Sequence, residues 1–176
     1  MNWEYRKKVD EVLKLHKLWV EGKGGQQADL RDIDLFDIDM FEYDLTYDNL
    51  MMAKGGAMAV ARTVICPQGE IIGWKKLRNS KLAKLIIPAE AERSNATGRM
   101  CRAEYAFVEN IFNIYGRNGD DPLIEVPCGT SMYDSNFVYM VGKIVHPGKW
   151  DDNRWNEVSN GIHFFITREE AIGYDY

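Results

Sequence analysis

The most constraining feature of this sequence is a repeat with a period of five residues that runs through residues 28–52. Each of five consecutive quintets has a leucine or methionine at its centre, directly after an aspartate or asparagine. A period of five fits neither an α-helix, with about 3.6 residues per turn, nor a β-strand, which repeats every ~2 residues. We therefore expect short units that each bury one apolar side chain against the next, as in a solenoid. The five centres are Leu30, Leu35, Met40, Leu45 and Leu50.

These quintets resemble the pentapeptide-repeat family, whose Ala-Asp/Asn-Leu-x-x units build a four-sided right-handed β-helix. The resemblance covers 25 of the 176 residues. It implies one short pentapeptide-type right-handed β-helix coil over residues 28–56.

Residues 3–21 have the pattern of an amphipathic helix, with Val9, Val12, Leu13 and His16 near one face. The glycines at positions 22, 24 and 25 supply the signal that ends the helix. We expect this N-terminal segment, residues 1–27, to cap the open end of the coil, because an uncovered coil would present unpaired backbone groups.

The pattern changes after the quintets to short apolar runs separated by turn residues. A hairpin of strands 59–65 and 71–77 is expected around Pro67-Gln68-Gly69, and Thr167-x-x-Glu170 is a capping box that opens a short terminal helix. Residues 57–176 are therefore expected to form one mainly antiparallel β domain with a C-terminal helix, and the chain an α+β protein. Further strands are expected at 82–87, 104–114, 137–145 and 161–166.

The composition indicates a globular protein, because 45% of the 176 residues are hydrophobic and can form a core. No apolar run approaches the ~20 residues that a membrane span needs. The first eight residues carry too many charges for a signal peptide. We therefore expect a soluble, cytoplasmic protein with no membrane partner.

The residue types that bind metals or carry out catalysis are scattered. Cys66, Cys101 and Cys128 are odd in number and far apart, so neither a disulfide framework nor a zinc site is expected. The three histidines, at positions 16, 146 and 163, are equally dispersed. Walker, dinucleotide-binding, His-Glu-x-x-His and Gly-x-Ser-x-Gly motifs are absent. We therefore expect no metal, no cofactor and no catalytic residues.

Charge is strongly segregated along the chain, although the net charge is only −5. Residues 28–52 carry eight acidic and one basic side chain, whereas residues 54–102 carry ten basic and three acidic ones. Clustered lysines and arginines raise the local potential and favour an anion. The alternative is that these charges lie on solvated strand faces or pair with the acidic quintets.

Three segments concentrate side chains suited to an anionic ligand with a ring. At residues 74–75 an aromatic face could stack on a base beside an ammonium group, although a half-buried tryptophan is the simpler interpretation. Residues 93–102 combine arginines, hydroxyls and a glycine, which suits charge-assisted bonds to an anion, and a solvated basic loop is the alternative. The third segment consists of residues 155–156 and 161–174, in which His163 either points toward a cleft or is a core histidine. The candidate ligand-binding residues are Trp74, Lys75, Arg93, Ser94, Thr97, Arg99, Arg102, Trp155, Asn156 and His163.

Several sequence blocks are similar to a domain of unknown function that follows pentapeptide repeats in proteins of tailed bacteriophages. The similarity covers most of residues 57–176 and implies a phage accessory protein. The blocks are residues 73–76, 87–88, 93–102, 136–142, 154–156 and 161–174.

Residues 161–174 also look like the Gly-Ile-Tyr-Phe-Ala strand and helix of ADP-ribosyltransferase-like folds, which bind NAD. The catalytic glutamate of those folds has no evident counterpart, because Glu169 and Glu170 fall on the helix cap. This likeness implies a pocket for an ADP-ribose-like molecule more than it implies turnover.

We therefore expect a small protein that sequesters an anionic nucleotide-like host immune signal, ADP-ribose-derived or a cyclic nucleotide, without turnover. One alternative is an acidic interaction or DNA-mimic protein that inhibits a host enzyme through the quintets. The other is an ADP-ribosyltransferase-like enzyme. A homo-oligomer is expected because an open coil end invites self-association. Nucleic acid is not expected as a partner, because acidic segments flank the basic one.

Overall fold

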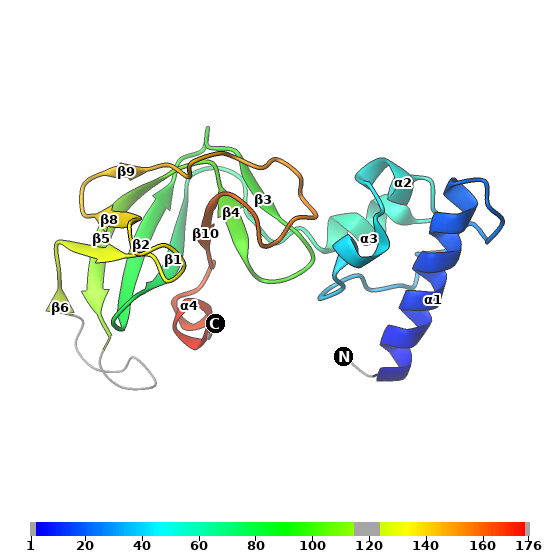
Figure 1. Cartoon of the computed structure of the whole chain (residues 1–176), viewed down its shortest axis with the longest axis horizontal. Helices are drawn as coiled ribbons and strands as arrows, with labels where there is room; N and C mark the ends of the chain where they lie inside the picture. The colour runs from blue at the N-terminus through cyan, green and yellow to red at the C-terminus, as the bar shows by residue number, and fades with distance from the viewer. Residues whose placement is uncertain (1–2, 115–123, 175–176) are drawn as a thin grey trace. The chain divides into compact units, whose positions relative to one another are not determined.

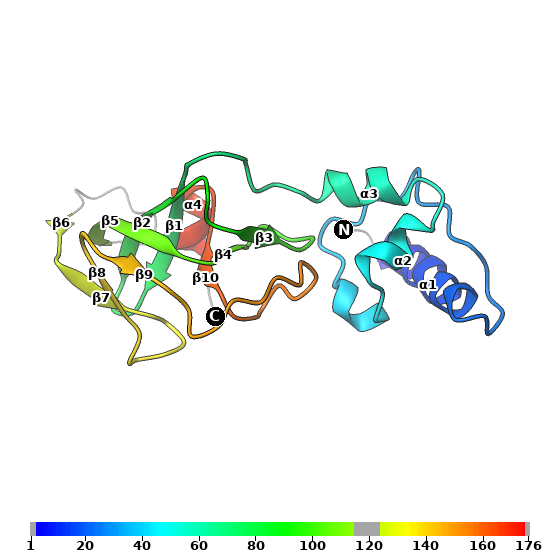
Figure 2. The same cartoon turned by 90° about the horizontal axis from the view of Figure 1, so that it is seen from above.

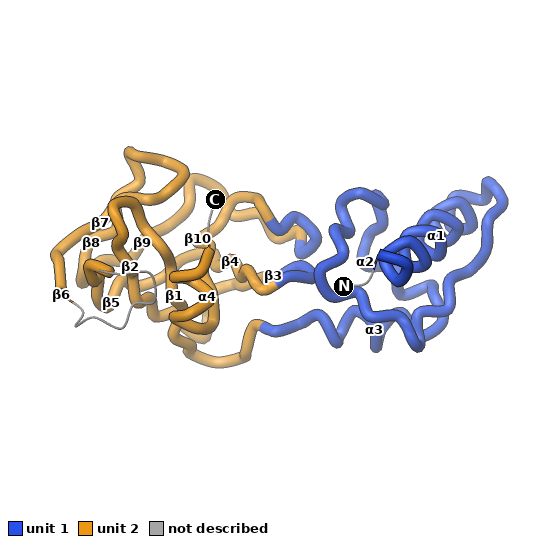
Figure 3. Tube along the Cα trace, turned by 90° about the horizontal axis from the view of Figure 1, so that it is seen from below, with its two compact units in different colours: residues 1–65, 95–98, 154–157 blue, residues 66–94, 99–153, 158–176 orange. Residues whose placement is uncertain are grey.

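The computed structural model describes residues 3–114 and 124–174 of the chain. The chain divides into two compact units, shown in different colours in Figure 3. The first consists of residues 1–65, 95–98 and 154–157, and the second of residues 66–94, 99–153 and 158–176. The first unit contains the helices α1 to α3 and the second contains most of the strands, so the predicted α+β class is confirmed.

Helix α1 (Trp3–Val20) packs its predicted apolar face against the quintets, burying Val9, Leu13 and His16 (Figure 1). The backbone N–H of Ala28 donates to Nδ1 of His16 at 3.3 Å. Nε2 must therefore carry the ring proton, and it lies 2.8 Å from the carbonyl oxygen of Asn49. His16 is a core histidine with both ring nitrogens satisfied, and it connects α1 to both ends of the quintet segment.

The prediction of a right-handed β-helix coil was wrong. Residues 28–52, all of them described, form turns and two short helices in place of strands. These are the 3-10 helix η1 (Met40–Tyr43) and the helix α2 (Tyr47–Met51), followed by α3 (Gly56–Arg62). The five quintet centres are nevertheless all buried, as the repeat predicts.

Local hydrogen bonds explain why the repeat makes turns. The amide of Ile33, at the start of the second quintet, donates to the carbonyl of Leu30, at the centre of the first, at 3.2 Å. The carboxylates of Asp34 and Asp39 accept the amides two residues further on at 2.9 and 3.0 Å. A β-helix needs a second coil beside the first to take up its backbone groups, and a single bridge, Asp29 to Lys54, joins the ends of this segment. The repeated aspartates act as turn formers.

The second unit is built on an antiparallel sheet with the strand order β1-β2-β5-β6, in which β9 also pairs with β5. A loop of three residues, 78–80, joins β1 to β2, and Asn79 and Ser80 in it have positive φ angles of 58° and 51°. The strands are β1 (Ile71–Leu77), β2 (Lys81–Ile87), β5 (Ala106–Asn113), β6 (Ile124–Glu125) and β9 (Ile144–Val145).

Two smaller sheets complete this part of the chain. One has the order β10-β4-β3, from β3 (Arg93–Asn95), β4 (Cys101–Ala103) and β10 (Ile162–Phe164), and the other pairs β7 (Cys128–Thr130) with β8 (Val138–Met140). Strand β10 lies beside β4, and just past its end a bridge from Phe165 to Trp74 ties the chain to β1 (Figure 2). Helix α4 (Arg168–Gly173) begins with the predicted Thr167 capping box, which is confirmed.

Two of the expected strands differ from the observed elements. Residues 59–65 were expected to be a strand, but residues 56–62 form helix α3, and the hairpin is made by β1 and β2. The expected strand 137–145 is interrupted by Gly142, whose φ of 78° turns the chain between β8 and β9. None of the helices in the described part of the chain has the length and apolar character that a membrane span requires.

Packing of β10 on β1 predicts the effect of one substitution. A Cβ atom at Gly73 would lie 2.6 Å from the ring of Phe164, which is fully buried. We expect Gly73→Ala to lower the free energy of unfolding by about 1–3 kcal/mol through overpacking. Gly173→Ala is the matched control, because no atom lies within 4 Å of its added Cβ. Chemical denaturation measures both, and equal effects of the two variants would contradict the packing described.

Candidate functional site

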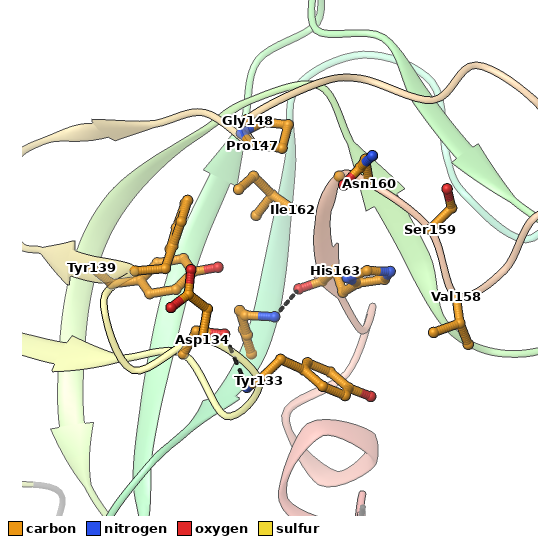
Figure 4. A pocket seen from close by; sticks show the side chains of 14 residues that line it. Tyr133, Asp134, Tyr139, Pro147, Gly148, Val158, Ser159, Asn160, Ile162 and His163 are labelled. Atoms are coloured by element: carbon orange, nitrogen blue, oxygen red, sulfur yellow. Dashed lines mark hydrogen bonds between the residues drawn. The ribbon is translucent and has the colours of Figure 1, made fainter.

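The second unit contains a pocket of about 460 Å³. Its walls come from β1, from the loop that precedes β8, from β8 itself and from the chain leading into β10. Figure 4 shows Asp134 and Tyr139 on one side of the pocket and Val158, Ser159 and His163 on the other. The lining residues are Lys75, Ser131, Tyr133, Asp134, Phe137, Tyr139, Pro147, Gly148, Val158, Ser159, Asn160, Gly161, Ile162 and His163.

Lys75 is the basic residue of this lining. Strand alternation places it on the same face of β1 as Gly73 and Leu77, which are also buried, so its side chain lies inside the unit with only 5% of its surface exposed. Its Nζ donates to the carbonyl oxygen of His163 at 3.1 Å and lies 5.8 Å from the ring centroid of Tyr139. The ammonium group is thus held between β10 and β8.

No acidic side chain in the described part of the chain forms an ion pair with Lys75. Asp134, the acidic residue of the lining, is exposed and its Oδ1 accepts the amide of Asn136 at 2.8 Å. Burial therefore acts on the amine without compensation and lowers the pKa of Lys75 to about 8. An anion in the pocket would supply the missing counter-charge.

Aromatic rings form much of the remaining wall. Phe137 and Tyr139 lie with their ring centroids 5.2 Å apart and their planes tilted by 55°. Tyr133, which is 55% exposed, also belongs to the lining and is drawn with it in Figure 4. Ring faces of this kind can pack against a planar group of a ligand, while the phenol hydroxyls can hydrogen-bond.

Arg102 fixes the wall that carries Ser159 and Asn160. Arg102 is 1% exposed, and its guanidinium donates to the carbonyls of Asp151, Asn160 and Asn153 at 2.7, 2.8 and 2.8 Å. The Trp150 ring lies 5.3 Å from the guanidinium carbon. Burial lowers the pKa of Arg102, although an arginine remains charged. Arg102 is thus a positioning residue beneath the pocket, opposite His163 in the β4 to β10 register.

Of the ten predicted ligand-binding residues, Lys75 and His163 line the pocket. Trp74 packs on the other face of β1 in a cluster with Phe165 and Tyr174. Arg93 donates to the backbone carbonyls of residues 67, 69, 88 and 91, and Arg99 pairs with Glu170 at 2.5 Å. These arginines hold loops and the α4 cap.

Ser94 is buried, and the remaining three predicted residues belong to the first unit. Thr97 donates its hydroxyl proton to the carbonyl of Ile38, and Trp155 lies in the core formed with the quintets. Asn156 follows it directly in the sequence. Eight of the ten predicted residues, Arg102 among them, thus lie outside the lining of this pocket, and one of the eight, Arg93, lines a separate pocket of about 420 Å³. Their role in ligand binding stays a prediction.

The sequence prediction missed the aromatic residues of the pocket. Phe137 and Tyr139 alternate in a run that was expected to be a strand, and strand periodicity puts both on one face. That pattern was available in the sequence. Tyr133 and Asp134 lie in a loop, and no sequence pattern indicates which strand they approach. No group of three or more His, Cys, Asp or Glu side chains in the described residues is arranged to hold a metal ion.

Burial of Lys75 predicts a pH dependence of stability. In the window between pH 8 and the usual lysine pKa of ~10.4, the unfolded chain keeps the proton that the folded chain has lost, so stability rises with pH. Between pH 7 and 10 we expect the unfolding free energy of the wild type to rise by roughly 2.5 kcal/mol more than that of Lys75→Met. Denaturant titrations at several pH values measure this.

Lys84→Met is the control for this measurement, because Lys84 lies on the neighbouring strand and pairs with Glu109 at 2.7 Å. Its curve should run parallel to that of the wild type over this range. Parallel curves for Lys75→Met and the wild type would show that the amine is not buried as described.

Comparison with known protein families matches residues 62–171 to a family of unknown function, DUF5758. The matched range contains every residue that lines the pocket. Comparisons with curated proteins and with solved structures found no match. The domain of unknown function expected from the sequence is thereby confirmed, while its association with pentapeptide repeats and phages stays a prediction. Because the match covers more than half of the chain, the protein belongs to the DUF5758 family of unknown function.

Proposed function

We propose that this protein binds a small anionic, nucleotide-like molecule in the pocket around Lys75 and holds it without turnover. The observation that carries the proposal is a buried ammonium group with one hydrogen bond, to a backbone carbonyl, and no ion-pair partner in the described residues. Burying a cation without a counter-ion costs free energy. An anion that binds beside it offsets this cost, and the offset contributes to the binding free energy. The charge state of Lys75 therefore favours an anionic ligand.

The shape and lining of the pocket support a ligand with a planar ring. Small-molecule sites commonly measure ~300–1,000 Å³ and combine apolar walls with a few polar groups. The pocket lies in this range at about 460 Å³, with Phe137, Tyr139 and Tyr133 as aromatic walls. A nucleotide-like molecule combines the required ring and negative charge.

Hydroxyl groups in the lining favour binding over nucleophilic catalysis. Ser131 accepts the amide of Tyr133 at 3.3 Å, and Ser159 donates to the carboxylate of Asp151. Both hydroxyls thus hold loop conformations. In the transferase alternative the catalytic glutamate has no evident counterpart, and the carboxylate of Glu170 caps α4 through Thr167 and pairs with Arg99.

The identity of the ligand and the biological setting extend this proposal. An ADP-ribose-derived or cyclic nucleotide made by a host under phage attack would be sequestered in the host cytoplasm. These finer statements draw on the sequence resemblances alone.

A second candidate is a protein interaction through the quintets. All eight acidic side chains of residues 28–52 are exposed, and Phe41 beside them is 72% exposed. An acidic surface with an exposed ring suits a basic partner. Salt-sensitive inhibition of a DNA-binding host enzyme by the purified protein, lost on changing Asp32, Asp37 and Glu42 to asparagine or glutamine, would support this function.

Ligand binding by Lys75 predicts a characteristic pH dependence. An anion binds the ammonium form, which becomes scarce as the pH rises through about 8. For a panel of nucleotides that includes AMP, a cyclic dinucleotide and ADP-ribose, we expect at least one ligand whose affinity falls about tenfold or more between pH 7 and 9.5. Isothermal titration calorimetry measures the affinity, and mass spectrometry of the recovered ligand tests turnover.

Lys75→Met should lower the affinity of that ligand by about tenfold or more, because truncation leaves its anion in the pocket without a counter-charge. Lys84→Met removes a paired surface lysine and should bind like the wild type. Equal affinities of Lys75→Met and Lys84→Met, or a ligand recovered in cleaved form, would count against the proposal.

A further inference from the structure

We infer that the Lys75 amine forms a reversible imine with an aldehyde or ketone group of the ligand that the pocket binds. The inference rests on the proposed function, since it adds a covalent bond to the binding of an anionic ring compound at the same site. It narrows the ligand to molecules that carry a reactive carbonyl beside a ring and a negative charge. An open-chain sugar phosphate attached to a ring is one such class.

The hydrogen bonding of the amine leaves its reactive electron pair available. The carbonyl oxygen of His163 can only accept, so it engages one N–H of Nζ at 3.1 Å. When the amine is neutral, its lone pair therefore points away from that oxygen, and Lys75 lines the pocket. A carboxylate partner would hold the proton on the nitrogen, and the described residues provide none for Lys75.

Most other lysines with assigned partners have a carboxylate or two acceptors. Lys81 donates to a single carbonyl, that of Cys128 at 2.9 Å, but it does not line the pocket. Lys14, Lys17 and Lys84 form ion pairs with carboxylates. Lys76 donates to two carbonyls, those of Ile172 and Tyr174, at 3.0 and 2.8 Å. Lys75 combines deep burial, a single acceptor and a position in the pocket lining.

Lys75 differs from an ordinary lysine in the fraction of its amine that is neutral. With the pKa of Lys75 near 8, about a quarter of the amine is neutral at pH 7.5, compared with about one in a thousand for a lysine of ordinary pKa. The neutral amine is the nucleophile in imine formation, and depressed pKa values are typical of lysines that form such bonds. Lys75 thus holds a large excess of the reactive form.

The chemical step balances without an oxidant or another reactant. Nζ attacks the carbonyl carbon and gives a carbinolamine, whose hydroxyl takes up a proton and leaves as water while the C=N bond forms. One of the two protons on nitrogen passes through a carrier to the carbonyl oxygen as the carbinolamine forms. The hydroxyl takes its second proton from solvent through the same carrier, and nitrogen keeps its remaining proton, so the product is a protonated imine. The His163 side chain lines the same pocket and is suited to carry these protons.

An imine remains compatible with an anionic ligand. A protonated imine keeps the positive charge at the position of the original ammonium group, so the counter-charge for the anion persists after the bond forms. The anion and the imine therefore support each other at one site.

Reductive trapping with pyridoxal 5′-phosphate tests the inference, because this probe combines a ring, a phosphate and an aldehyde. The full chain is incubated with the probe at pH 7.5 and treated with sodium borohydride, and the labelled lysines are identified by peptide mass spectrometry. We expect Lys75 to be labelled about tenfold faster or more than Lys84, in line with its larger neutral fraction. The Lys84→Met variant should retain the Lys75 label, and Lys75→Met should lose it.

Pyridoxine 5′-phosphate, which lacks the carbonyl, separates this inference from the proposed function. If it binds and Lys75 is labelled no faster than Lys84, the imine is overturned and anion binding stands. If it does not bind, while pyridoxal without phosphate labels Lys75 selectively, the imine is supported and the anion site is overturned. Labelling of the wild-type chain decides the question even if Lys75→Met fails to fold.

Discussion

The pocket depends on one buried guanidinium group, that of Arg102. Three backbone carbonyls of residues 151–160 accept hydrogen bonds from this guanidinium. The segment contains no strand or helix, so no regular backbone pairing holds it in place. Charge-assisted bonds from a planar group with fixed geometry hold an irregular loop in one conformation. That loop leads directly into His163, whose carbonyl receives the Lys75 ammonium. Arg102, which binds no ligand in the proposed function, thereby helps to position Lys75, which does.

Lys75 shows how a hairpin can carry a functional group at little structural cost. Strands β1 and β2 pair over seven residues and are joined by a loop of three residues, so the position of Lys75 is fixed by a regular ladder. The pairing of β1 with β2 stabilises the hairpin enough to offset the free-energy cost of burying the amine, without a local ion pair. Such uncompensated burial is the usual physical origin of a reactive or ligand-binding lysine. The same property links the anion site to the imine that we infer there.

Sequence patterns predicted well wherever the controlling interactions are local. The α1 face, the Thr167 capping box and the burial of every quintet centre follow from spacing alone, and the structure has all three. The β-helix failed because it requires pairing with a second coil, which 25 residues cannot supply, so the aspartates satisfied nearby amides and made turns. The sequence predicted that the arginines of residues 93–102 bind an anion. In the structure Arg93 and Arg102 donate to backbone carbonyls and Arg99 pairs with Glu170.

The sequence alone determined the α+β class and the buried quintet centres, because periodicity is a property of short segments. It named Lys75 and His163 only as two of ten candidate residues. Only the tertiary structure decided that these two residues meet, since they are 88 positions apart and join through strands β1 and β10. It also decided that Tyr133, Phe137 and Tyr139 complete the pocket. Burial, and with it the unusual charge state of Lys75, is a property of the assembled walls and has no signature in the neighbouring residues.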